Sequence, residues 1–156
     1  MKTVVVGCGN LLAADDGVGI HVVRELAPHL EEVEGVDVVE VAAGGMSLLD
    51  VLVGYERAIL VDATEGTGSR PGEVRMIRKK EIKTGGFRAW SLHGFGPAEA
   101  LALGRRVIPG LLPEEVVIIG IEASRKDGLS RGLSPEVAAA VPRAARLVLK
   151  VLGVVR

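Results

Sequence analysis

Cysteine, aromatic residues and side-chain amides are scarce in this chain of 156 residues. Its single cysteine, Cys8, excludes an internal disulfide, and this favours a reducing compartment. Aromatic residues make up only 3% of the chain, so Val, Leu, Ile and Ala must fill the interior. There is no glutamine and one asparagine, Asn10, whereas charged residues are plentiful. Scarce thermolabile amides suggest a source that lives at high temperature.

The chain also lacks an excess of charge and a long hydrophobic run. Its formal net charge is −1, so no general attraction steers it toward nucleic acid. The longest apolar runs, such as Val116–Ile121, are far too short to cross a bilayer. The N-terminal residues resemble a strand that leads into a loop, without the cleavage region of a signal peptide. We therefore expect a cytoplasmic protein that binds neither nucleic acid nor membranes.

The length suits one domain, residues 1–156, with a full hydrophobic core. Apolar residues alternate along the chain between the spacing of strands and that of helices. The expected strands are Thr3–Val6, Val36–Val41, Ala58–Asp62, Glu73–Arg78 and Val116–Ile121. The expected helices run from about Gly17 to Leu30, from Met46 to Val53, from Pro97 to about Val107, and from Pro135 onward with Ser134 as its cap. This order predicts a three-layer α/β/α fold with a mostly parallel sheet.

One strand is expected to run against the others. Only ten residues, 63–72, separate the strand that ends at Asp62 from the strand that begins at Glu73. A crossover between parallel strands needs a dozen residues or more. The Glu73–Arg78 strand is therefore predicted to be antiparallel.

Candidate functional residues follow from the sheet, because ligands of open α/β sheets bind outside the carboxyl ends of the strands. Asp15 and Asp16 follow the first strand, Asp62 ends the third, and Glu65 lies just beyond it. His93 precedes the helix at Pro97, at the same predicted end of the sheet. Two carboxylates and an imidazole there would form a three-ligand site with open positions. Such a set suits a borderline divalent ion such as nickel, zinc or iron.

Each candidate also has a structural interpretation. Asp15 and Asp16 can cap a helix, Asp62 can accept hydrogen bonds from turn amides, and His93 can be a surface residue. Spacing alone leaves these alternatives open. His21 and His29 lie on the first helix and are interpreted as structural or solvated residues.

Other chemistries find less support. Cys8 follows a buried strand with no obvious base nearby, which disfavours a nucleophilic role. Gly7 and Gly9 begin a dinucleotide-binding pattern, but its third glycine would fall at Leu12, so the match fails. Peptidyl-tRNA hydrolases share a Gly-x-Gly-Asn turn, yet here Leu11 stands where that family has proline, and the chain lacks a basic excess. That esterase class and a non-catalytic metal- or nucleotide-binding module remain the alternatives.

Short motifs occur between residues 4 and 137 in a characteristic order. They are Gly7-Cys8-Gly9-Asn10-Leu11-Leu12, Asp15-Asp16-Gly17-Val18-Gly19, Gly44-Gly45-Met46-Ser47-Leu48-Leu49, Tyr55-Glu56-Arg57 leading to Val61-Asp62-Ala63, Ser91-Leu92-His93, and Gly132-Leu133-Ser134-Pro135-Glu136-Val137. In this combination the chain resembles the hydrogenase maturation proteases, the endopeptidases that complete the large subunit of nickel–iron hydrogenases.

The resemblance implies a five-stranded mixed sheet between helices, of the phosphorylase/hydrolase-like kind. It implies metal-contacting and catalytic roles for Asp16, Asp62 and His93 in an aspartic-type, nickel-sensing endopeptidase. The implied partner is the immature large subunit, which carries the nickel and loses a C-terminal peptide, and zinc can replace nickel in vitro. Two departures concern the choice of substrate: Gly94-Phe95-Gly96 follows the histidine, and Ala123 stands where a proline is common.

Overall fold

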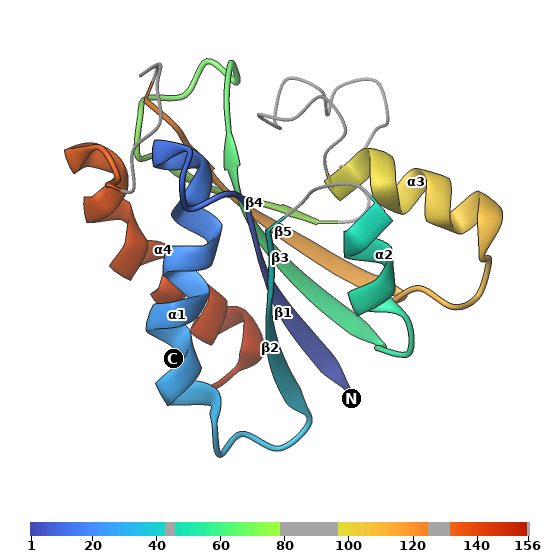
Figure 1. Ribbon diagram of the computed structural model, residues 1–156. Coiled ribbons are helices and arrows are strands. Elements are labelled where there is room, and N and C mark those ends of the chain that lie inside the picture. The colour runs from blue at the N-terminus through green and yellow to red at the C-terminus, as the bar shows by residue number, and fades with distance from the viewer. Residues whose placement is uncertain (43–45, 79–96, 125–131, 156) are drawn as a thin grey trace.

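The protein forms one five-stranded sheet with helices on both faces (Figure 1). The computed structural model describes residues 1–42, 46–78, 97–124 and 132–155, and of Met46, Pro97 and Ala98 it describes the backbone only. The strands are β1 (Thr3–Cys8), β2 (Val36–Val41), β3 (Arg57–Thr64), β4 (Val74–Arg78) and β5 (Glu115–Glu122). Their order across the sheet is β2-β1-β3-β5-β4. Only the β4–β5 pair is antiparallel, which confirms the prediction drawn from the short connection after Asp62.

The helices divide into two pairs that cover opposite faces of the sheet (Figure 1). These pairs are α1 (Val18–Leu30) with α4 (Pro135–Leu152) and α2 (Met46–Leu52) with α3 (Pro97–Val107), and a short 3-10 helix, η1 (Ala14–Gly17), precedes α1. Side chains of α1 and α4 share one hydrophobic cluster with the sheet, and side chains of α2 and α3 share the other. The three-layer α/β/α prediction is therefore confirmed.

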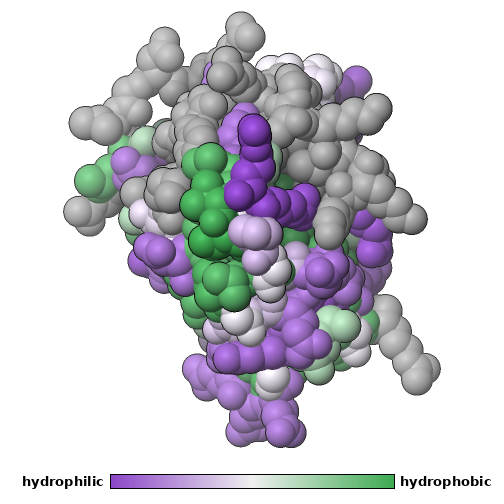
Figure 2. Space-filling model, turned by 90° about the vertical axis from the view of Figure 1, so that its right-hand side faces the viewer, coloured by the Kyte–Doolittle hydropathy of each residue, from purple (hydrophilic) through white to green (hydrophobic). Residues whose placement is uncertain are grey.

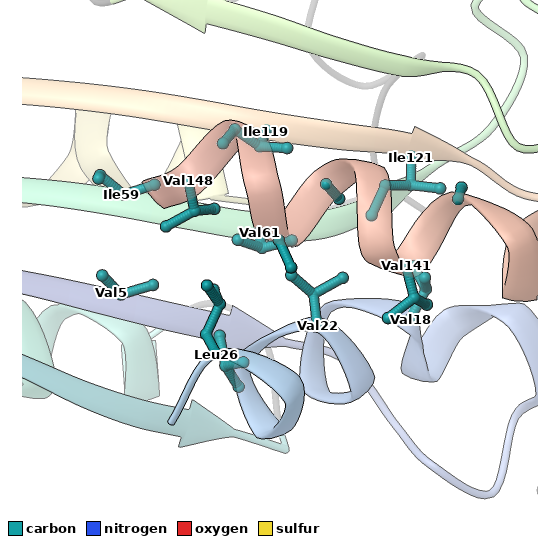
Figure 3. Close-up of a cluster of buried hydrophobic side chains, with 14 of the residues drawn as sticks. Val5, Val18, Val22, Leu26, Ile59, Val61, Ile119, Ile121, Val141 and Val148 are labelled. Carbon is teal, nitrogen blue, oxygen red and sulfur yellow. The ribbon is translucent and has the colours of Figure 1, made fainter. Parts of the chain in front are cut away.

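The face under α1 and α4 holds a large cluster of buried apolar side chains (Figure 3). Strand residues Val5, Val61 and Ile119 point to this face and pack against Leu26 of α1 and Val148 of α4. All five side chains are almost completely buried. Because side chains alternate along a strand, the cluster takes alternate residues of the central strands, such as Ile59, Val61 and Ala63 of β3.

The intervening strand residues point to the other face, toward α2 and α3. Leu60 and Ile118 pack there against Leu52 of α2 and Leu101 of α3. Figure 2 views the molecule from this side and shows hydrophobic surface beside hydrophilic surface. The exposed apolar side chains of α2, α3 and the turns that follow them are Val53, Leu103, Val107 and Leu111.

Helix α1 lies close against the sheet because its second residue is a glycine. A Cβ atom at Gly19 would collide with the carbonyl oxygen of Val61 and would lie 2.5 Å from that of Cys8. The first turn of α1 therefore rests directly on the backbone of β1 and β3. This contact brings η1, which precedes α1, over the carboxyl ends of the same two strands.

The expected helices and strands all occur, and their ends differ from the observed ones by at most two residues. One expected cap needs a correction. Ser134 occupies the N-cap position of α4 as predicted, but its side chain makes no capping hydrogen bond. Its hydroxyl donates to Asp15 Oδ2 at 2.8 Å, so the side chain turns toward η1 rather than toward the first turn of α4. The expected turn at Gly44-Gly45 and the expected loop Ile82–His93 lie outside the described residues. No helix in the described part of the chain is both long and apolar enough to cross a membrane.

Candidate active site

The carboxyl ends of β1, β3 and β5 carry polar side chains on the face that α2 and α3 cover. Register pairs Gly7 with Val61 and Asp62 with Gly120, so Cys8, Asp62 and Gly120 follow one another across the sheet. Strand alternation turns Cys8 and Asp62 to the same face. The apolar strands β1 and β3 thus carry Cys8 and Asp62 side by side at their carboxyl ends.

Asp16 reaches this row from a tightly bonded loop that joins β1 to η1. The backbone N–H of Asn10 donates to Asp16 Oδ2 at 3.0 Å, and Asn10 Oδ1 accepts from the N–H of Leu12 at 2.9 Å. Gly9 has φ +140°, and a Cβ atom there would collide with the Asp16 carbonyl. Glycine is therefore required for the loop to fold back so that Asp16 returns to the strand ends.

Asp16 and Asp62 form a buried acidic pair although 46 positions separate them in the sequence. Their exposed fractions are 4% and 6%. Burial raises the pKa of Asp62 well above its ordinary value, and the negative charge of Asp16 raises it further, against a lowering effect of the Ala63 N–H that donates at 2.8 Å. A proton on Asp62, or a cation beside it, would relieve this unfavourable charge.

Cys8 lies beside this pair but is poorly suited to act as a nucleophile. Burial raises the pKa of its thiol well above the ordinary value, and the charges of Asp62 and Asp16 raise it further. The thiol therefore stays protonated at neutral pH, and the thiolate is the reactive form. This agrees with the structural interpretation of Cys8.

Asp15 neither caps α1 nor joins the acidic pair. Its carboxylate is 4% exposed and accepts hydrogen bonds from Ser124 N at 2.9 Å, from Ser134 N at 2.7 Å and from Ser134 Oγ at 2.8 Å. The two neighbouring acids of η1 thus bind different segments of the chain: Asp15 binds Ser124 and Ser134, whereas Asp16 binds Asn10. Glu65, the remaining acidic candidate, is exposed.

Glu122, which is buried at the carboxyl end of β5, is not among the residues predicted from the sequence. Its Oε1 accepts from Thr64 Oγ1 at 2.8 Å and from Thr67 Oγ1 at 3.0 Å, so it ties the segment after β3 to β5. An acid that closes an apolar strand is the same signal that predicts Asp62. Applied to Val116–Ile121, that signal finds Glu122 as well.

The third predicted ligand, His93, lies outside the described residues. Within the described ranges no three acids, histidines or cysteines are grouped so that they could hold a metal ion. The chemistry of the described pair nevertheless fits a divalent cation. Asp16 and Asp62 offer buried carboxylate oxygens whose mutual repulsion a cation would relieve.

The departure at position 123 has a structural consequence. The N–H of Ala123 donates to the carbonyl of Thr64 at 2.8 Å and prolongs the pairing of β3 with β5. Proline has no N–H and would lose this bond. Alanine therefore extends the sheet by one hydrogen bond immediately beside the site.

Comparisons with known proteins agree with this architecture. A family model described as "Hydrogenase maturation protease" matches residues 20–151. The hydrogenase maturating endopeptidase HybD from E. coli has a TM-score of 0.78 and 26% identity, covering 97% of this chain and 92% of that one. The NiFe hydrogenase maturation protease HybD from Thermococcus kodakarensis has a TM-score of 0.77 and 31% identity, covering 97% and 99%.

A similar relative in sequence is the coenzyme F420 hydrogenase subunit delta of Methanothermobacter thermautotrophicus, 30% identical over 161 aligned positions that cover 98% of this chain and 96% of that protein. The family model spans most of the chain, and both structural relatives share its sheet and helices over nearly their whole length. The chain therefore belongs to the hydrogenase maturation protease family, and it is an endopeptidase.

Proposed function

We propose that this endopeptidase removes a C-terminal peptide from the nickel-loaded precursor of a nickel–iron hydrogenase large subunit. The observation that carries the proposal is the buried pair of Asp16 and Asp62 at the carboxyl ends of β1 and β3. Membership in the family suggests the class of substrate. The buried acidic pair supports a metal-bearing substrate, because a cation would offset its negative charge.

Asp16, Asp62 and His93 are the residues that contact the precursor's nickel in this proposal. The two carboxylates supply negative charge at a buried position, and an imidazole adds a nitrogen ligand that suits nickel or zinc. A divalent cation held there can polarise the scissile carbonyl or lower the pKa of an attacking water. Because the substrate brings the metal, the free enzyme needs to hold nickel only weakly. Zinc can occupy the same ligands in vitro.

Carboxylates rather than a serine or cysteine carry the reaction, so the enzyme is of the aspartic type. Water adds to the carbonyl carbon, the peptide C–N bond breaks, and a new carboxyl terminus and a free amine result. Asp16 and Asp62 orient the metal-bearing segment so that this bond lies within reach. No acyl-enzyme forms, since the buried Cys8 thiol stays protonated beside the two acids.

The alternatives are weaker. A peptidyl-tRNA hydrolase-like esterase needs a basic surface for tRNA, whereas the net charge of this chain is −1. A non-catalytic metal- or nucleotide-binding module does not account for the match to a protease family along most of the chain. The single cysteine favours a cytoplasmic site of action.

The test mixes the purified protein with nickel-loaded and with nickel-free precursor and follows the released C-terminal peptide by mass spectrometry. We expect release from the nickel-loaded precursor only, unchanged cleavage by Cys8→Ala, and no effect of serine- or thiol-directed inhibitors. A trapped acyl-enzyme, or loss of cleavage in folded Cys8→Ala, would overturn the metal-directed mechanism. Efficient cleavage of nickel-free precursor would overturn nickel recognition but not the protease assignment.

A further inference from the structure

Asp15 is a buried carboxylate that the proposed mechanism does not use. It is 4% exposed, and both of its oxygens accept hydrogen bonds from the protein. The donors are the backbone N–H of Ser124 and both the backbone N–H and the hydroxyl of Ser134. A carboxylate with three such partners is held in one orientation.

The partners of Asp15 come from distant parts of the chain. Ser124 follows β5 and Ser134 precedes α4, at separations of 109 and 119 residues from Asp15. One side chain of η1 therefore ties together both ends of the connection between β5 and α4. An amide in its place would offer one accepting oxygen and would turn an NH2 group toward donors.

The residue next to Asp15 is Asp16, in the same helix η1. This helix has only four residues, its N-cap residue Ala13 makes no side-chain capping bond, and Ala14 has φ +49°. On one side Asp16 is held by the N–H of Asn10 at 3.0 Å. On the other side it is joined covalently to Asp15.

We infer that Asp15 is a positioning residue for cleavage: by binding Ser124 and Ser134 it fixes η1 so that the carboxylate of Asp16 stays close to Asp62. Its effect on cleavage rests on the proposed function. The effect of Asp15 on the position of Asp16 is independent of the proposed function, because the position of Asp16 can be measured without substrate.

The test compares Asp15→Asn, Ser134→Ala, the double variant and the control Val148→Ala. Val148 is a buried residue of α4 that contributes only to the core under α1 and α4, so its truncation lowers stability without touching η1. All are assayed at a temperature at which each is folded. The first readout is the amide resonance and hydrogen exchange of Asn10, whose N–H binds Asp16. The second is kcat and KM for peptide release from nickel-loaded precursor.

Asp15→Asn should move the Asn10 amide resonance and speed its exchange, and Val148→Ala should do neither. Asp15→Asn should lower kcat about 10- to 100-fold while KM changes less than about threefold, because a misplacement of about 1 Å alone can cost about a hundredfold in rate. Ser134→Ala removes one of three bonds and should have a smaller effect. It should add nothing to Asp15→Asn, since the two residues act through one interaction.

An unchanged Asn10 amide in folded Asp15→Asn, additive effects of the two substitutions, or an equal fall of kcat in Val148→Ala would overturn the inference. If wild-type protein releases no peptide, the proposed function fails, and the Asn10 amide still decides whether Asp15 positions Asp16.

Discussion

The two faces of the sheet are built from the same strands but differ in cover and in chemistry. Helices of 13 and 18 residues, α1 and α4, close one face over a core of aliphatic side chains (Figure 3). Shorter helices of 7 and 11 residues, α2 and α3, cover the other face, and there the strands end in Cys8, Asp62 and Glu122. Side chains that alternate along the same strands thus form an apolar core on one face and a row of buried polar groups at the end of the other.

This difference shows how stability and chemistry are kept apart in a small chain. Buried acids lower stability unless hydrogen bonds or charges compensate them. Among the described residues the buried acids are Asp62 and Glu122 near the carboxyl ends of β3 and β5, and Asp15 and Asp16 in η1. The long helices α1 and α4 cover the opposite face. The following substitutions test that division.

The largest expected effect is on cleavage. Asp62→Ala should lower peptide release about a hundredfold or more, because it removes half of the buried acidic pair and misplaces the scissile bond. Asp50→Ala is the matched control, since Asp50 is an exposed acid on α2, over the same face. Mass spectrometry of the released peptide measures both. Cleavage by Asp62→Ala at the rate of Asp50→Ala would remove Asp62 from the site.

Truncation of a buried leucine should lower the unfolding free energy by different amounts on the two faces. Leu26 of α1 and Leu52 of α2 are both fully buried. Leu26→Ala should cost about 3–5 kcal/mol of unfolding free energy and Leu52→Ala about 2–3 kcal/mol, because the end of a short helix can collapse more easily onto a cavity. Chemical denaturation measures both values. Equal costs, or a larger cost at Leu52, would contradict the expectation that α2 adjusts to a cavity more easily than α1.

Glycine-to-alanine substitutions should distinguish a helix that packs against backbone from a helix that packs against side chains. A Cβ atom at Gly19 meets the carbonyl oxygens of Cys8 and Val61, whereas at Gly104 of α3 it meets the methyl groups of Leu49 and Leu112 at 2.7 Å. Gly19→Ala should cost about 2–3 kcal/mol. At Gly104 the side chains can move, and a gain in helix propensity of up to about 1 kcal/mol opposes the crowding.

Thermal and chemical unfolding of the two glycine variants decides this prediction. Gly19→Ala should also weaken cleavage, because it lifts α1 and η1 from the strand ends. A larger loss of stability at Gly104 would mean that the α2/α3 face is the less adaptable one.

The smallest expected effect is a gain in stability. The pKa of Asp62 is raised in the folded state, so folding favours its protonated form. The stability from that form is fully present below the unfolded pKa of about 4 and is lost as pH rises through the folded pKa. Asp62→Asn mimics the neutral form and should stabilise the metal-free protein by about 1 kcal/mol near pH 8, with the gain vanishing toward pH 4.

Unfolding free energies at several pH values in the presence of a chelator measure this gain. Asp50→Asn, at an exposed acid, should show no such dependence. A gain at pH 4 that equals the gain at pH 8 would contradict the burial of an ionisable Asp62.

Much of the site can be predicted because its signals are local. Asp62 ends an uninterrupted apolar strand, and Asp16 follows a glycine-rich turn after another. Parallel strands bring their carboxyl ends to one edge of the sheet, so the sequence alone predicts that the two acids lie together. Glu122 carries the same local signal as Asp62, but its carboxylate binds the hydroxyls of Thr64 and Thr67. The pattern places an acid at a strand end and does not say which partner that acid meets.

Local pattern therefore determined the α/β architecture, the antiparallel strand and the placement of the acidic pair, because hydrophobic period, connection length and strand polarity are properties of neighbouring residues. The tertiary structure alone decided what each acid does. Asp15 and Asp16 are adjacent and chemically identical, yet one binds Ser124 and Ser134 and the other raises the pKa of Asp62. Hydrogen bonds across more than a hundred residues depend on how β5 and α4 dock against η1, and no spacing in the sequence encodes that contact.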